Sequence, residues 1–181
     1  MRHGKPVLPP LNKISPKLFI GWVDAYNISG LCSASVPTDE ALKISTQSCA
    51  VVCSALPRSI ESAKALGAKN ITLISAKFNE AEMPISDWCF PKLSPKIWAV
   101  FFRVVWFFGY SKNSETFKEA KLRAKESVAI LKEQAKINTT VLFVGHGVYN
   151  RLLANELNAT GWLGPESPGS KYWSYGVYKP L

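Results

Sequence analysis

The stretch that decides the fold is Thr139-Thr-Val-Leu-Phe-Val-Gly-His-Gly147. Residues 139–144 are β-branched or apolar, which predicts a short buried strand. Glycines flank His146, and residues 148–157 have the pattern of a helix. A strand that turns directly into a helix is the unit of an α/β sheet, in which ligands bind beyond the carboxyl ends of the strands. We therefore expect His146 in a binding site beside the start of a helix.

Similar units precede this stretch. Residues 49–53 form a short apolar run that predicts a buried strand, and Pro57 then stands at a favourable first-turn position for a helix over 58–66. Gly67 ends that helix, and residues 71–75 predict a second β-branched strand. The alternation of strands and helices predicts an α/β sandwich with a largely parallel sheet. Arg58, like His146, then follows a strand at the start of a helix.

The remaining segments are less regular. Residues 5–38 are rich in Pro, Gly and Ser and are interpreted mostly as loop, with a short helix beginning after Thr38 as N-cap. Two helices are expected farther on, an aromatic one over 97–108 and one over 114–134 whose apolar residues recur at three- and four-residue steps. Residues 175–178 are interpreted as a last, edge strand.

Composition limits the possible functions. The chain has 181 residues, 47% of them hydrophobic, which suits a single domain over residues 1–181. Its net charge of +9 could attract nucleic acid, an anionic membrane or a phosphorylated small molecule. The basic residues are dispersed and no nucleic-acid-binding motif is present, so we expect no nucleic-acid partner. The composition sets no expectation for the oligomeric state.

Location and metal content follow from a few features. Four cysteines without CxxC spacing are interpreted as free thiols of a reducing cytosol, and no metal site is expected. The amino terminus lacks a long apolar run, so no signal peptide is expected and the predicted location is cytoplasmic. The apolar run 97–110 is too short to span a bilayer and contains Arg103. It is interpreted as a buried helix or one in peripheral contact with a membrane.

The second histidine stands at the start of the chain, in Arg2-His3-Gly4. These two histidines are the only ones present, and glycine follows each of them. Histidine can act as nucleophile, base or phosphate ligand, so the pair suggests phosphoryl transfer through one imidazole while the other holds the phosphate. A strand would be expected before His3, yet only two residues precede it. We expect either that this first strand is missing or that it lies upstream of Met1.

Four segments in order resemble the histidine phosphatase superfamily, in its short single-domain, phosphoglycerate mutase-like branch. They are Arg2-His3-Gly4, Ser54-Ala-Leu-Pro-Arg58-Ser, Phe78-Asn-Glu80-Ala-Glu82 and Val144-Gly-His146-Gly. The resemblance covers nearly the whole chain and implies a three-layer α/β/α sandwich. It also implies a phosphatase that works through a phosphohistidine, without a metal or another cofactor.

The resemblance assigns roles to individual residues. It implies that His3 is the nucleophile and that Arg2 and Arg58 bind the phosphate oxygens in fork geometry. It implies that His146 is a further phosphate ligand, either donating a hydrogen bond or protonated. The backbone N–H of Gly147, at a helix start, is expected to add another donor.

A carboxylate must protonate the leaving alcohol, and the matching segment makes Glu80 the acid/base, with Glu82 in reserve. The substrate class is left open between a phosphorylated small molecule and a phosphoprotein. Mutase activity is not expected, because insertions that would hold a bisphosphate are not recognisable. The alternative is a non-catalytic module that uses the same fold to bind phosphate or to contact a membrane surface. Asn150 and Arg151, one turn after His146, are candidates to support the site, and a surface ion pair is the equal alternative for Arg151.

Overall fold

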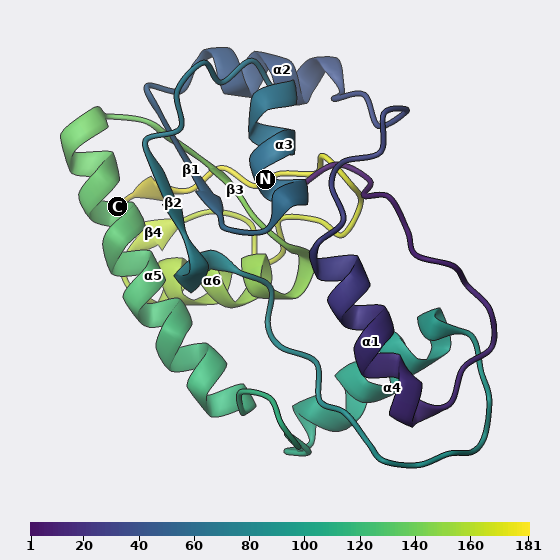
Figure 1. Cartoon of the computed structure of the whole chain (residues 1–181). Coiled ribbons are helices and arrows are strands. Elements are labelled where there is room, and N and C mark those ends of the chain that lie inside the picture. Colours follow the sequence, from purple (N-terminus) through teal and green to yellow (C-terminus); the bar gives the residue numbers. More distant parts are fainter.

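The computed structural model describes all 181 residues and contains one central parallel sheet (Figure 1). The strands of this sheet lie in the order β2-β1-β3. The strands are β1 (Ala50–Ser54), β2 (Leu73–Ser75), β3 (Val141–Val144), β4 (Trp162–Leu163) and β5 (Lys179–Pro180). The helices are α1 (Pro16–Asn27), α2 (Asp39–Thr46), α3 (Pro57–Ala65), η1 (Ala76–Phe78, a 3-10 turn), α4 (Pro95–Phe107), α5 (Phe117–Asn138) and α6 (Gly147–Ala159).

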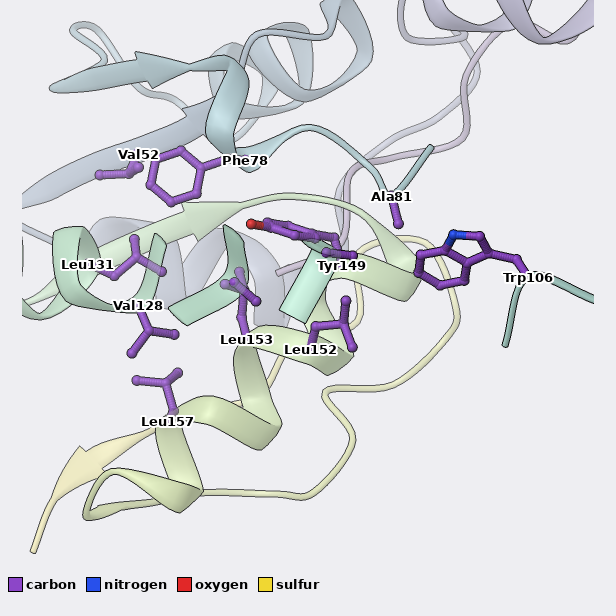
Figure 2. Close-up of a cluster of buried hydrophobic side chains, with 12 residues drawn as sticks. Val52, Phe78, Ala81, Trp106, Val128, Leu131, Tyr149, Leu152, Leu153 and Leu157 are labelled. Carbon is purple, nitrogen blue, oxygen red and sulfur yellow. The ribbon is translucent and has the colours of Figure 1, made fainter. Parts of the chain in front are cut away.

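Every residue of β1 is buried because both faces of the central sheet are covered. Val51 and Cys53 point to the face that packs on α2 and α3, whereas Val52 points to the face covered by α5 and α6. Figure 2 shows Val52 and Phe78 with the apolar side chains of α5 and α6 on this second face. The predicted three-layer α/β/α sandwich is therefore confirmed.

The first three residues run along the edge of the sheet beside β3. Arg2 forms a parallel bridge with Gly145, and the backbone N–H of His3 donates to the Gly145 carbonyl at 3.0 Å. In return, the N–H of Gly145 donates to the carbonyl of Met1 at 2.9 Å. The residues before His3 thus pair as a strand does, and they bring His3 level with the carboxyl end of β3.

The prediction that residues 5–38 are mostly loop is wrong over α1. Pro16 begins this helix at a position where a missing N–H costs nothing, so its proline favours a helix start rather than a loop. The helix is held by apolar contacts with α4, in which Phe19 packs on Trp98 and Phe102. Figure 1 shows α1 and α4 together at one end of the molecule, beside the sandwich. No helix is long and apolar enough to cross a bilayer.

The predicted edge strand over residues 175–178 is also wrong. The N–H of Trp173 donates to the Arg2 carbonyl, and the N–H of Arg2 donates to the Ser174 carbonyl at 2.8 Å. The pairing of this segment with the backbone of Arg2 thus involves residues 173 and 174, which precede the predicted strand. Farther on, β5 pairs antiparallel with β4 in a separate two-stranded sheet. Arg2 and β4, the two pairing partners of this part of the chain, are both distant from it in sequence. An alternating pattern within residues 175–178 therefore could not locate the strand.

Candidate functional site

The sheet brings the two histidines together. His3 follows the edge segment paired with β3, and His146 follows β3 itself as the N-cap of α6. Their ring centroids lie 5.0 Å apart, and both side chains are buried, with 2% of His3 and 0% of His146 exposed. The pairing expected from the two glycine-flanked histidines is therefore present, although 142 residues separate them in the chain.

The His3 ring is held in one tautomer. Its Nδ1 lies 2.6 Å from the carbonyl oxygen of Gly4, so Nδ1 carries the hydrogen and Nε2 keeps its lone pair. Burial lowers the pKa of His3 to about 3, with the Gly4 hydrogen bond opposing this shift and Arg58 and Arg2 adding to it. At neutral pH the ring is thus uncharged and has a free nitrogen lone pair, which is the form that a nucleophile requires.

His146 is fixed by a different set of contacts. Its Nε2 lies 2.6 Å from the hydroxyl of Ser54 at the end of β1, and its backbone N–H donates to Oδ1 of Asn150. The amide of Asn150 also donates to the Met1 carbonyl, so this side chain ties the two histidine segments together. Burial, followed by the charges of His3 and the arginines, holds the pKa of His146 well below its usual range. His146 is therefore a neutral hydrogen-bonding group in this structure rather than a protonated one.

Arg58 is 1% exposed and stands in the first turn of α3, after Pro57. Its Nη1 donates to the carbonyl of Tyr26 at 3.0 Å, its Nη2 donates to Oδ1 of Asn27 at 3.4 Å, and the guanidinium lies over the Tyr26 ring. Burial lowers the pKa of Arg58, while Tyr26 and Glu80 raise it. The end of α1 thus fixes this cation beside the two histidines.

Arg2 is held by residues from the C-terminal part of the chain. Its Nη1 donates to the Ser170 carbonyl, and its guanidinium lies 4.7 Å from the centre of the Tyr172 ring. A Cβ atom on Gly147 would lie 3.4 Å from Cζ of Arg2, so the guanidinium packs against the first residue of α6. The N–H of that first residue has no acceptor within its own helix. Arg2 and Gly147 therefore offer donors at one place.

Three nitrogen atoms of these side chains are buried without a hydrogen-bond partner. They are Nε of Arg2, Nε of Arg58 and Nδ1 of His146. Buried polar atoms are nearly always paired in proteins, so three unpaired ones in a single cationic cluster mark a place for a ligand. Both arginines act electrostatically on both histidines, which makes the cluster a site of positive potential. Such a cluster can bind an oxyanion.

Glu80 is brought to the same end of the sheet, and Glu82 is turned elsewhere. The Glu80 carboxylate accepts hydrogen bonds from the backbone N–H groups of Val148 and Tyr149, at 3.1 and 2.8 Å, in the first turn of α6. The Glu82 carboxylate accepts instead from the backbone N–H of Glu115, just before α5. Of the two candidate acids, Glu80 is thus the one next to the His146 turn.

Several residues of the site were not predicted from the sequence. Ser54 is predicted only as part of a segment, and Tyr26, Asn27 and Ser170 are not among the predicted site residues. Tyr26 and Asn27 lie on α1, within the range predicted to be mostly loop. Pro16 was the available signal, because a proline followed by apolar residues at helical spacing predicts a helix start.

A separate groove lies on another part of the molecule and contains neither histidine. It is a groove of about 650 Å³ beside β3, the C-terminal half of α5 and residues 175–180. Its lining contains neither histidine nor arginine, and no carboxylate side chain. A groove without histidine, arginine or a carboxylate lacks the groups of phosphohistidine chemistry. We therefore place the candidate active site at the histidine cluster. No group of His, Cys, Asp and Glu side chains is arranged to hold a metal ion.

Comparison with known proteins gives matches in three-dimensional structure only. No protein-family model matches the sequence, and no curated protein does. A mycobacterial glucosyl-3-phosphoglycerate phosphatase, solved in complex with VO3, is 17% identical with a TM-score of 0.60, and the match covers 98% of this chain and 89% of that one. The α-ribazole phosphatase from Shigella flexneri is 19% identical with a TM-score of 0.55, covering 87% and 77%.

A variant of the phosphoserine phosphatase from Entamoeba histolytica, in complex with phosphoserine, is 17% identical with a TM-score of 0.53, and the match covers 87% of this chain and 77% of that one. All three similar structures are members of the histidine phosphatase superfamily. At these identities the likeness concerns the fold, and the predicted phosphoglycerate mutase-like fold is confirmed.

Proposed function

We propose that this chain, which has the phosphoglycerate mutase-like fold of the histidine phosphatase superfamily, hydrolyses phosphate monoesters through a phosphohistidine on His3. The observation that carries the proposal is a neutral, buried His3 together with two buried arginine N–H groups and one His146 nitrogen that have no partner. A phosphate group has the charge and the acceptor oxygens that such donors lack. The proposal needs no metal, because the two arginines supply positive charge for the transition state.

The first chemical step is attack on phosphorus. The lone pair of His3 Nε2 forms the N–P bond while the bond from phosphorus to the ester oxygen breaks. Arg2, Arg58 and His146 hold the non-bridging oxygens, and the N–H of Gly147 can add a donor. The leaving oxygen takes a proton from the carboxyl group of Glu80.

The second step regenerates the enzyme. A water molecule attacks the phosphohistidine, the N–P bond breaks, and the proton lost by the water returns to Glu80. His3 recovers its neutral form, and inorganic phosphate leaves. Glu80 is suited to both steps because the N-terminal turn of α6 fixes its carboxylate beside His146 and Gly147.

The depth of the cluster favours a small substrate over a folded phosphoprotein. Both His3 and Arg58 are almost fully buried, so only a phosphate carried on a slender part of the substrate can reach them. The similar structures include phosphatases named for small phosphorylated compounds. We therefore propose a phosphorylated small molecule as substrate and hydrolysis rather than mutase chemistry. The four cysteines form no disulfide, which suits a reducing compartment such as the cytoplasm.

Hydrolysis of p-nitrophenyl phosphate with and without a chelator tests this function. We expect turnover that the chelator leaves unchanged and that His3→Ala abolishes. Quenching during turnover should trap acid-labile phosphate on His3, read by mass spectrometry. Arg151→Ala, an exposed change on α6, is the matched control and should keep full activity. A wild-type protein that binds phosphate but shows no turnover on any phosphate ester would refute catalysis and favour a phosphate-binding module.

A further inference from the structure

The outward side of α4 is apolar along its whole length. Pro95, Trp98, Phe102 and Trp106 are its buried residues. The exposed apolar residues of α4, with the one that follows it, form a set that we call the α4 face: Ile97, Val100, Phe101, Val104, Phe107 and Phe108. At 100° per residue these positions fall within about 120° of the helix circumference, so they form one stripe. A helix on the surface of a soluble protein ordinarily presents polar side chains there.

The side chains of this stripe are well exposed. Phe108 is 87% exposed, Val100 is 66% exposed and Ile97 is 51% exposed. The loop before α4 adds two more exposed aromatic residues, Trp88 at 56% and Phe90 at 75%. A contiguous apolar surface of this kind marks an interaction site.

The exposed charges of α1 and of the loops beside α4 are mostly positive. Lys13, Lys17, Lys92 and Lys96 are exposed and form no ion pair, whereas Lys112 is paired with Asp87. Asp24 is the exposed acid of α1, and the Arg103 guanidinium is turned inward to the carbonyls of Ala81 and Glu82. The helix itself contains no acidic residue, and Lys96 is exposed next to the stripe. Two copies of this surface brought face to face would repel each other, whereas an anionic surface would be attracted.

We propose that the α4 face docks on the surface of an anionic lipid bilayer. The helix lies in the plane of the interface, with its phenylalanine and valine side chains among the acyl chains near the headgroups. The surrounding lysines lie against lipid phosphates, and Trp88 is at the depth where aromatic rings are favoured. This docking is independent of the phosphatase chemistry, because no residue of the α4 face belongs to the histidine cluster.

Co-sedimentation with lipid vesicles tests the docking. The full chain should bind vesicles of phosphatidylcholine that contain phosphatidylglycerol, and bind vesicles of phosphatidylcholine alone far less. Raising the salt from about 0.1 to about 0.5 M should weaken the binding, since it screens the lysines. The double variant Val104→Ser/Phe108→Ser should lose at least about tenfold in partitioning, as expected for two apolar side chains withdrawn from the bilayer.

A matched control changes two exposed apolar residues on α5, Leu122→Ser/Ile137→Ser, which should leave vesicle binding unchanged. Thermal unfolding of both double variants verifies that they fold. Equal binding of the wild type and the α4 variant would overturn the proposal, as would failure of the wild type to bind anionic vesicles. If the wild type is a dimer and only the α4 variant is a monomer, the α4 face binds a second copy of the chain, and the proposal is also overturned. His3→Ala should bind vesicles normally, which separates this test from that of catalysis.

Discussion

The free energy of unfolding should fall as the pH is lowered, and His3 should account for a measurable part of the fall. Burial lowers the pKa of His3 from 6.5 to about 3 in the folded protein. An unfolded chain exposes the ring, which then titrates near its ordinary value. Between these two pKa values the unfolded state binds one proton more than the folded state. Stability from this group is therefore fully present above pH 6.5 and is lost as the pH falls toward 3.

The size of the effect follows from the two pKa values. Between pH 7 and pH 5 the contribution of His3 to the free energy of unfolding should drop by about 2 kcal/mol, and by about 1.4 kcal/mol for each further pH unit. The variant His3→Gln cannot take up this proton. The difference in stability between the wild type and His3→Gln should therefore shrink by about 2 kcal/mol over the same range. His146 has a lowered pKa as well, and it adds a slope of the same sign to both proteins.

Urea unfolding at pH 7, 6 and 5, at constant ionic strength and without phosphate, measures this difference. Ser62→Ala is a suitable control, because it removes the hydroxyl that accepts the Gly4 N–H but leaves every titrating group in place. Its stability should run parallel to that of the wild type across the pH range. If His3→Gln also runs parallel to the wild type, the ring is not held neutral by burial and the reasoning fails.

Three further predictions concern single side chains. Glu80→Gln should lower kcat by about 10²- to 10⁴-fold. The loss should be larger for an alkyl phosphate than for p-nitrophenyl phosphate, because the poorer leaving group needs the proton. Equal losses on both substrates would contradict the acid role. Ser54→Ala leaves Nε2 of the buried His146 without its partner, so urea unfolding should show a loss of about 1–3 kcal/mol. Gly4→Ala would drive a methyl group into the Trp173 ring. Thermal or urea unfolding should show a loss of about 1–3 kcal/mol in the free energy of unfolding. Unchanged stability would show that the ring can move aside.

Local patterns were sufficient to predict the sandwich and to choose the candidate side chains of the site. The β-branched run of β3 and the glycines around His146 specify a strand and a turn within nine residues. Pro57 and Gly67 mark the start and the end of α3 in the same way, so Arg58 could be placed at a helix start. These features depend on backbone preferences and on burial periodicity, which are properties of short segments.

The support of the site was decided only by tertiary structure. Tyr26 and Asn27 meet Arg58 because α1 packs on α4, and the Ser170 carbonyl meets Arg2 although the two are 168 positions apart in the chain. The choice between Glu80 and Glu82 likewise depends on which one reaches α6.

The sequence by itself therefore singled out the residues proposed to carry the chemistry: two histidines, two arginines and a pair of candidate carboxylates, each marked by its neighbours along the chain. Only the tertiary structure decided how they act together. It buried His3 and so lowered its pKa, and it left one buried side-chain nitrogen each of Arg2, Arg58 and His146 without a hydrogen-bond partner. Burial and unpaired donors result from packing between segments far apart in the chain, and no local pattern contains that information.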